Sequence, residues 1–299
     1  MDQQLQVFVT VVERENFSRA AEELHMTQPA VSHYIQTLER QFGTRLLERS
    51  NKFVQLNKAG EIVYHHAKEI LNLYKKMHYL VDDLTAKATG YLPIGASYTF
   101  GEYVLPHIIA AMHDRYPLIR PAITIGNTKE IAELVKSHQV EVGIIEGELA
   151  DESILVEPFA VDEMVIFASR QHHLAHTKPT RKQLSEETRI IREKGSGTRT
   201  AVDHLFRKLN LAPKNVLEFG STQLIKESVE AGVGISMLSS WAIRKELQIG
   251  TLHVLSVEGL PFKREFSLVT AKTPFQTKAL ELFLQFVRET TEKFEVPKS

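Results

Sequence analysis

Hydrophobic positions over residues 18–42 follow two short helical periods separated by a tight turn. The first period starts at Ser18, which can cap a helix, and its buried face consists of Ala20, Ala21 and Leu24. The second helix is predicted to be capped by Thr27, with Pro29 in its first turn. Its core-facing positions are Val31, Ile35, Leu38 and Phe42. This pattern predicts a helix-turn-helix.

The opposite stripe of the second helix is polar and uncharged and consists of Gln28, Ser32, His33 and Gln36. Such side chains suit base edges in a major groove, since Gln pairs with adenine and Ser adapts to several bases. Gly43 is expected to end the helix, and a short apolar alternation then predicts a hairpin wing. The basic residues around this wing are Arg40, Arg45, Arg49, Lys52 and Lys58, against the single acid Glu48. The alternative is an ordinary helix pair with a solvated polar face.

Residues 58–88 repeat apolar positions at spacings of four and three, which is a heptad pattern. The predicted seam consists of Val63, Ala67, Ile70, Tyr74, Met77, Val81 and Leu84. A seam of this period favours pairing with a second copy, which would bring two DNA-reading heads together. A long helix that packs on its own body is the alternative.

From Tyr91 onward the pattern changes to alternating strands and helices. Strands are predicted at 91–97, 122–126, 140–147, 163–169, 188–193, 216–220, 234–238 and 265–271. Helices are predicted at 102–116 and 129–139 and after residues 198, 222 and 275. This alternation predicts parallel sheets covered by helices on both faces.

Ligands of such sheets bind at the carboxyl ends of strands, where helix N-termini converge. Ser97 and Thr99 follow the first of these strands, Glu146 follows the third, and the turns 193–199 and 220–223 follow later ones. The turn EKGSGTR at 193–199 offers backbone N–H groups and hydroxyls to an anion, and it lacks the P-loop pattern. A flexible turn that merely begins a helix is the alternative reading of that segment.

Composition narrows the class of protein. The 299 residues carry a formal net charge of −1, which excludes a generally basic nucleic-acid coat protein but permits a locally basic head. The absence of cysteine excludes thiol redox sensing and thiolate metal sites. His172, His173 and His176 fall in a polar loop, and we expect no metal site and no cofactor there. Neither a G-x-S-x-G nor an H-E-x-x-H motif is found, and no signal peptide or membrane-length apolar span is evident.

The segment FSRAAEELHMTQPAVSHYIQTLERQFGTRLLER resembles the N-terminal signature of the LysR-type transcriptional regulators, most densely in its run A-A-x-x-L-x-x-T-Q-P-A-V-S. The resemblance implies an α/β fold with an N-terminal winged helix-turn-helix at 1–58 and a dimerising linker helix at 59–89. It further implies a two-lobed, periplasmic-binding-protein-like effector domain at 90–299. Lobe I would then comprise 90–161 and 266–299, and lobe II 162–265, with the chain crossing near 161–163 and 263–266.

The side-chain patterns and the resemblance together predict two sets of site residues. The DNA-binding set is Thr27, Gln28, Pro29, Ser32, His33, Gln36, Arg45, Arg49 and Lys52. The effector-binding set is Ser97, Thr99, Phe100, Glu146, Ser196, Gly197, Thr198, Arg199 and Thr222. His33 departs from the residue that many members carry. The role of Glu146 has three alternatives, because a carboxylate that faces an anion would repel it. Glu146 pairs with Arg199, binds a cationic group of an amphoteric ligand, or points away from the site.

The function that unites these features is a ligand-responsive, cytoplasmic DNA-binding regulator, activator or repressor, that senses a small anionic metabolite or inorganic anion. Its expected partners are double-stranded promoter DNA with an interrupted dyad, the anionic effector and further copies in a homodimer or homotetramer. RNA polymerase is a further candidate partner, and no membrane is expected. The wording REKGSGTR is closest to branches tied to sulfur or carbon assimilation. The alternative is a metabolic enzyme or solute-binding domain with a DNA-binding appendage.

Overall fold

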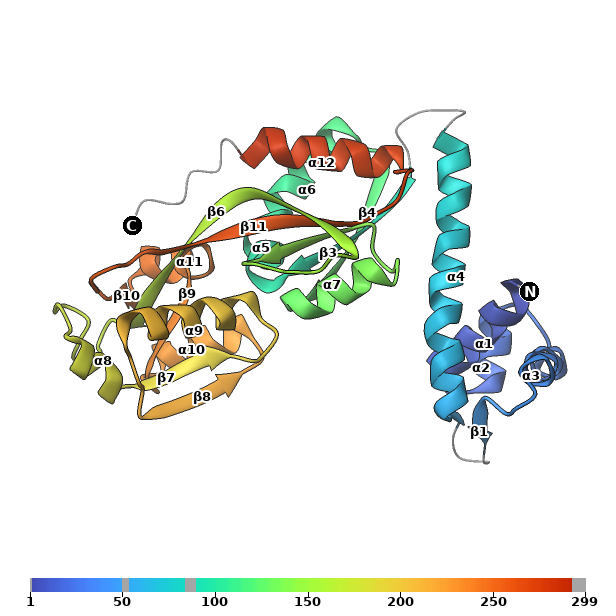
Figure 1. Ribbon diagram of the computed structural model, residues 1–299, viewed down its shortest axis with the longest axis horizontal. Coiled ribbons are helices and arrows are strands. Elements are labelled where there is room, and N and C mark those ends of the chain that lie inside the picture. The colour runs from blue at the N-terminus through green and yellow to red at the C-terminus, as the bar shows by residue number, and fades with distance from the viewer. Residues whose placement is uncertain (1, 50–53, 84–89, 292–299) are drawn as a thin grey trace. The chain divides into compact units, whose positions relative to one another are not determined.

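The computed structural model describes residues 2–49, 54–83 and 90–291. The chain divides into two compact units, 1–84 with 137–139 and 85–136 with 140–299. Each unit is described by itself. The first contains the elements α1 (Asp2–Arg14), α2 (Phe17–Glu23), α3 (Gln28–Phe42), β1 (Leu47–Arg49), β2 (Val54–Leu56) and α4 (Lys58–Asp83) (Figure 1).

Helices α2 and α3 form the predicted helix-turn-helix. The Thr27 hydroxyl accepts a hydrogen bond from the Ala30 N–H and caps α3, and Gly43 ends this helix at φ 65°. The expected cap of α2 was wrong: the cap lies two residues earlier, at Asn16, whose side chain accepts from the N–H groups of Ser18 and Arg19. Asn competes well for this position because its short side chain carries an acceptor oxygen.

The core of the head consists of the apolar faces of α1, α2 and α3 together with the start of α4. Val31, Ile35 and Leu38 are buried as predicted. Phe42 is 52% exposed, which corrects the expectation that it faces the core. It is the last residue of α3, where the helix has passed beyond the other elements of the head's core.

The predicted seam of α4 is divided between two environments. Val63 and Ala67 are buried in the head's own core, so they cannot contact a second chain. Beyond them the helix exposes a row of large apolar side chains: Ile70, Leu73, Tyr74, Met77 and Val81. Leu84 lies outside the described residues. The part of the seam that is open to a partner therefore starts at Ile70.

The second unit contains a mixed sheet covered by helices. Its strands are β3 (Gly90–Ser97), β4 (Ile119–Gly126), β5 (Val142–Glu146), β6 (Ile154–Ser169), β7 (Thr188–Arg192), β8 (Asn215–Phe219), β9 (Ile235–Ser239), β10 (Leu252–Val254) and β11 (Phe262–Ala271). Its helices are α5 (Tyr98–Tyr103), α6 (Leu105–Arg115), α7 (Thr128–Lys136), α8 (Arg181–Glu186), α9 (Gly197–Leu209), α10 (Thr222–Glu230), α11 (Ser240–Ile249) and α12 (Lys278–Thr291).

The strand order is β4-β3-β5-β11-β6-β9-β7-β8, with β10 beside β6. Parallel pairs link β4, β3 and β5 in one half and β9, β7 and β8 in the other, as the alternation predicted. The two halves are joined by the antiparallel strands β6 and β11, which run side by side from one lobe into the other (Figure 1). Asp162 on β6 is directly opposite Arg264 on β11.

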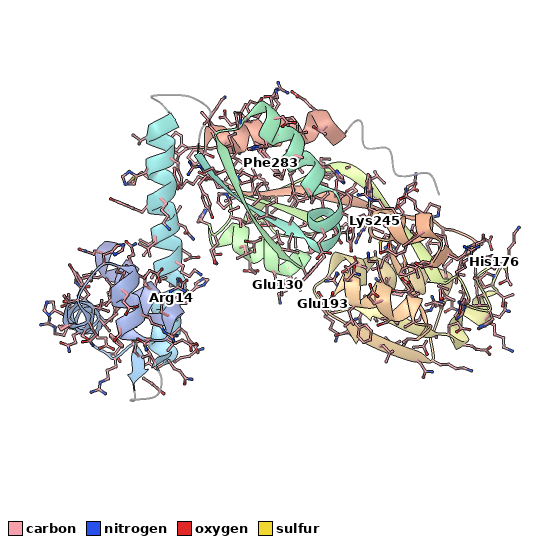
Figure 2. All side chains as sticks on the ribbon, turned by 180° about the vertical axis from the view of Figure 1, so that it is seen from behind. Arg14, Glu130, His176, Glu193, Lys245 and Phe283 are labelled. Atoms are coloured by element: carbon pink, nitrogen blue, oxygen red, sulfur yellow. The ribbon has the colours of Figure 1, made fainter. Side chains whose placement is uncertain are left out.

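Separate apolar clusters fill the two lobes. One joins β3, α6 and α12 around Phe283 (Figure 2), and a second cluster of the same lobe lies under α7. The other lobe has its own clusters under α9 and α10. The effector unit is thus a two-lobed α/β fold. It differs from expectation in that residues 154–169 form one continuous strand and that the helix expected at 102–116 is broken at Val104 into α5 and α6.

Candidate functional sites

The exposed face of α3 carries the polar stripe predicted to read bases. Gln28, His33 and Gln36 are exposed and Ser32 is half-buried. The Gln28 amide Nε2 donates to the Ser32 hydroxyl at 3.0 Å, which holds the two side chains together one helical turn apart. Thr27 and Pro29 are exposed at the start of the helix. These groups are accessible and suited in type to hydrogen bonding with base edges.

Two partly buried hydrogen bonds to Glu39 fix the wing to α3. One Glu39 carboxylate oxygen accepts from the N–H groups of Leu46 and Leu47, at 3.0 and 3.4 Å, where the chain enters β1. A hollow of about 940 Å³ lies between α3 and this segment, and its lining includes His33, Arg40 and Arg45. It brings cationic groups beside the reading face, which suits a phosphate backbone. Lys52 lies outside the described residues.

The predicted effector residues converge at the junction of the two lobes. Ser97 ends β3, Thr99 lies in α5, Glu146 ends β5, Ser196 caps α9 and Thr222 begins α10. Each of these residues is at most 3% exposed. The junction is therefore closed over these side chains.

The centre of the junction is a buried ionic cluster, which we call the arginine network: Arg264, Glu146, Asp162, Thr99 and Thr198. Arg264 Nη1 lies 2.8 Å from a Glu146 carboxylate oxygen, and Arg264 Nε lies 2.7 Å from Asp162. The same guanidinium donates to the hydroxyls of Thr198 and Thr99, at 3.0 and 3.2 Å. One cation therefore joins both lobes and both crossover strands.

The two carboxylates of the arginine network are shifted in opposite directions. Burial raises the pKa of Glu146, but the Arg264 charge and hydrogen bonds from Ser97 and Thr99 outweigh it, so the pKa of Glu146 is lowered. Burial dominates at Asp162 and raises its pKa despite Arg264 and the hydrogen bond from Ser239. Glu146 is therefore the carboxylate held ionised by this network, paired with Arg264 rather than with Arg199.

Further contacts close the lobes along one edge of the junction. The Lys129 N–H donates to the Gly195 carbonyl at 3.2 Å, and the Asn127 amide donates to Glu193 at 3.4 Å. A Cβ on Gly197 would lie 2.0 Å from the Glu146 carbonyl oxygen. Only glycine fits at this position while the lobes are in contact.

Two residues of the predicted effector set lie away from the junction's polar groups. Phe100 packs in the core, with ring centroids 5.5 Å from Phe159 and 5.1 Å from Phe266. Arg199 is held by Asp203 and Glu218, at 3.0 and 2.6 Å. The charge of Arg199 is thus neutralised within lobe II, although this residue belongs to the effector-binding set predicted from the sequence.

Arg192 is the buried arginine at this end of the sheet, and its charge is also paired, with Glu193 at 2.7 and 2.9 Å. It ends β7, is 1% exposed, and donates to the Thr222 hydroxyl at 3.0 Å. Its guanidinium also lies 4.4 Å from the centroid of the Tyr98 ring of lobe I.

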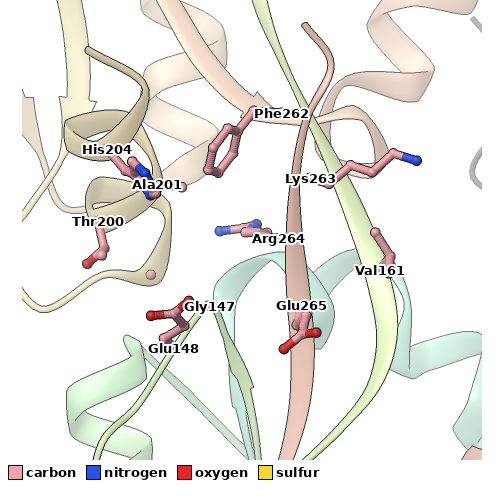
Figure 3. A pocket seen from close by; sticks show the side chains of 11 residues that line it. Gly147, Glu148, Val161, Thr200, Ala201, His204, Phe262, Lys263, Arg264 and Glu265 are labelled. Carbon is pink, nitrogen blue, oxygen red and sulfur yellow. The ribbon is translucent and has the colours of Figure 1, made fainter. Parts of the chain in front are cut away.

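A cavity of about 480 Å³ opens on the crossover side of the arginine network. Figure 3 shows Arg264 pointing toward α9 and Lys263 pointing away from it, with Phe262 and His204 on the far wall. Glu148 and Glu265 border it below. This cavity was not anticipated from the sequence.

Family models match the two units of the chain separately. Residues 3–61 match the bacterial regulatory helix-turn-helix protein, lysR family, and residues 85–292 match the LysR substrate binding domain. The chain belongs to the LysR family. It is a ligand-responsive, DNA-binding transcription regulator and not an enzyme.

The relatives of this LysR regulator include the HTH-type transcriptional regulator CysL of Bacillus subtilis, which is 38% identical over 285 residues and covers 95% of each chain. The crystal structure of full-length CbnR with its target DNA has a TM-score of 0.75 and covers 97% of this chain and 99% of that one. At 21% identity it shows the shared fold. The regulatory domain of Synechocystis PCC6803 CcmR in complex with 2-PG has a TM-score of 0.63 at 28% identity and covers 69% of this chain and 99% of that one.

LysR regulators bind DNA, respond to small molecules and assemble into oligomers, which agrees with the partners expected from the sequence. Within the part of the chain that the structure describes, no helix is both long enough and apolar enough to cross a membrane.

Sequence reasoning missed Arg264, Asp162 and Arg192. The first two occupy the predicted crossings at 161–163 and 263–266, so opposite charges at two adjacent crossings were an available signal. Arg192 lies next to the end of the strand predicted at 188–193, which was also visible.

The histidine cluster also differs from the one considered in the sequence. His172 and His173 converge on Glu187, at 3.3 and 3.1 Å, whereas the His176 ring lies against the His253 ring.

Proposed function

We propose that the head of this LysR regulator reads DNA through the α3 stripe, and that the junction of the two lobes binds a small anion which controls the head. The reading residues are Gln28, Pro29, Ser32, His33 and Gln36, with Thr27 at the helix start and Arg45, Arg49 and Lys52 on the phosphate backbone. The target is double-stranded promoter DNA with an interrupted dyad, and the proposed location is the cytoplasm, where such DNA is accessible.

The main support for an anion site is the start of α9. Ser196 is its N-cap residue but makes no side-chain cap bond, so the first N–H groups of this 13-residue helix receive no such bond. Helix N-termini of this kind favour anions. Ser97 of lobe I is buried nearby, with its hydroxyl close to the Glu146 carboxylate. Arg192 and Arg264 supply buried positive charge at the same junction.

The anion class is a compact oxyanion or a small phosphorylated or carboxylated metabolite. The solved complex of CcmR with 2-PG, which is 28% identical to this chain, supports a carbon-metabolism effector. Sulfate is the candidate for the sulfur-assimilation branch of the family, to which the sequence REKGSGTR is similar.

The test is isothermal titration calorimetry of the full-length protein with sulfate, phosphate and 2-phosphoglycolate. The Thr99→Val, Ser196→Ala double variant removes one hydroxyl from each lobe. The loss of one hydrogen bond from a hydroxyl to a charged ligand costs about 1.5–3 kcal/mol. We therefore expect the affinity for the anion to fall at least tenfold. Equal affinity of both proteins for the anion would place its site elsewhere.

We also propose that the exposed row of α4 from Ile70 to Val81 pairs with a second copy, giving a homodimer that builds the homotetramer. The domain boundaries that fit this account are 1–58 for the head, 59–89 for the linker helix and 90–299 for the effector domain. Within the last, lobe I comprises 90–161 and 266–299 and lobe II comprises 162–265.

A further inference from the structure

The Glu146 carboxylate receives hydrogen bonds from both lobes and from the crossover strand. Its Oε1 accepts from the Thr99 backbone N–H at 2.7 Å. Its Oε2 accepts from the Thr198 hydroxyl at 3.2 Å and from Arg264 Nη1 at 2.8 Å. Thr99 and Thr198 belong to the set expected to bind the effector, and the third donor is the buried Arg264 guanidinium.

This coordination is the kind that a bound anion receives in a protein site. Backbone N–H groups, hydroxyls and a guanidinium that point at two carboxylate oxygens form short, charge-assisted hydrogen bonds. The carboxylate is fully enclosed, with the residue 2% exposed. The lowered pKa of Glu146 agrees with an ionised group at this position.

We propose that Glu146 is a built-in anionic competitor, whose side chain occupies the donors of Thr99, Thr198 and Arg264 until an effector anion takes its place. This inference rests on the proposed function, because it concerns the same junction between the lobes. It resolves the conflict between a site built for an anion and a carboxylate inside that site.

The Glu146 backbone is held by contacts that do not involve its side chain. The Glu146 carbonyl is fixed by the Thr128 hydroxyl at 3.2 Å and by the close approach of Gly197. Arg264 keeps its ion pair with Asp162 when Glu146 departs, so no buried guanidinium is left without a carboxylate. Exchange of Glu146 for a ligand therefore requires side-chain rotation and not a new strand position.

A tethered competitor also selects among anions. A group attached through a short linker acts at an effective concentration of about millimolar or more. A free monocarboxylate that uses the same donors gains nothing over the Glu146 carboxylate, whereas a compact dianion interacts more strongly with Arg264. The ligand class is therefore a small dianion such as sulfate or a phosphorylated metabolite.

The experiment compares full-length wild type with Glu146→Gln and with the matched control Glu148→Gln. Both variants lose one carboxylate charge, but Glu148 is exposed and makes no contact in the arginine network. Titration calorimetry with sulfate and with 2-phosphoglycolate at constant ionic strength should give at least about tenfold tighter binding to Glu146→Gln, or about 1.4 kcal/mol. Glu148→Gln should bind within twofold of wild type.

A second variant, Glu146→Ala, tests occupancy of the same donors and does not depend on how Gln packs. Acetate should bind this variant and compete with sulfate, whereas acetate should leave sulfate binding to wild type unchanged. Thermal unfolding of each variant shows that it is folded before titration.

Unchanged or weaker sulfate and 2-phosphoglycolate binding by Glu146→Gln would overturn the competitor role. If Thr99→Val still weakened wild-type binding in that case, the anion site would stand and only the role of Glu146 would be wrong. Absence of binding by every protein to both anions would overturn the anion site and the competitor together.

Discussion

The reading face of α3 and the junction between the lobes differ in how their polar groups are used. On α3 the polar side chains are exposed and make few bonds, with the Gln28 amide and Ser32 hydroxyl bonded to one another. At the junction, Glu146, Arg264 and Asp162 are buried and bonded to each other across both lobes. The first site is open to its partner, and the second is satisfied without one.

This difference has a consequence for energetics. Exposed groups on α3 lose little when DNA is absent, since water satisfies them. Buried charges at the junction must remain paired at every step, because an unpaired buried charge is costly. Substitutions should therefore change DNA affinity in the head and stability or ligand selectivity at the junction.

The largest effect is expected from Arg264→Met. This change leaves Glu146 and Asp162 buried without a cation, and breaking such a pair typically costs about 3–5 kcal/mol. Urea unfolding of the effector domain should show this loss. Lys263→Met is the control, since its side chain is 68% exposed and should change stability by no more than about 0.5 kcal/mol. Equal stability of the two variants would contradict the importance of the arginine network.

The next largest effect tests the open part of the linker helix. Ile70→Asp places a charge in the exposed row that we expect to pair with a second copy. In that interface the charge would be buried without a partner, which typically costs about 3–5 kcal/mol. Analytical ultracentrifugation should show dissociation. Lys75→Asp, on an exposed polar position of the same helix, should leave the assembly intact. An unchanged oligomeric state in Ile70→Asp would mean that the row does not pair.

A smaller effect is expected at the reading face. Gln28→Ala or Ser32→Ala removes a base-reading group and should cost roughly 1–3 kcal/mol at a cognate site, with little change on unrelated DNA. Arg45→Ala should weaken binding to all sequences and reduce the salt slope by about one. Quantitative footprinting at several salt concentrations distinguishes the two kinds of change. Unchanged protection by Gln28→Ala and Ser32→Ala would remove α3 from base reading.

The smallest effect is a dependence of stability on pH. The pKa of Glu146 is lowered in the folded protein. Its contribution to the free energy of unfolding is therefore fully present above the ordinary glutamate pKa of about 4.3 and is lost as the pH falls through the folded pKa. The pKa of Asp162 is raised, so that group acts in the opposite sense. In an Asp162→Asn background, the stability difference between Glu146 and Glu146→Gln should shrink as the pH falls from 7 to about 3, a range that extends below the ordinary glutamate pKa. A constant difference would mean that Glu146 is not ionised in the fold.

The head could be predicted from the sequence because its signals are local. The cap at Thr27, the end at Gly43 and the buried positions of α3 depend on neighbours within a few turns. Phe42 and Ser18 were misassigned because each lies at a helix boundary, where one residue of shift changes the environment. Val63 and Ala67 matched the heptad pattern but pack on α1–α3, and periodicity alone cannot identify the partner surface.

The junction was only partly predictable because its contacts join residues far apart in the chain. Arg264 lies more than a hundred residues from Glu146 and Asp162, and no spacing rule relates them. The turn at 193–199 was placed correctly at a helix start, but the sequence could not show that Arg199 pairs with Asp203 and Glu218. Mutual neutralisation depends on tertiary geometry, which a single sequence does not contain.

The most direct test of the account is the coupling between the junction and the head. Wild type first selects its site from a random-sequence DNA library, and fluorescence anisotropy then measures the Kd of that site with and without saturating sulfate or 2-phosphoglycolate. Linkage between two sites typically amounts to about 1–3 kcal/mol, so one of these anions should change the Kd about 5- to 150-fold, and Thr99→Val, Ser196→Ala should abolish the change. An identical Kd with and without both anions, in a protein that binds the selected DNA, would contradict control of the head by an anion between the lobes.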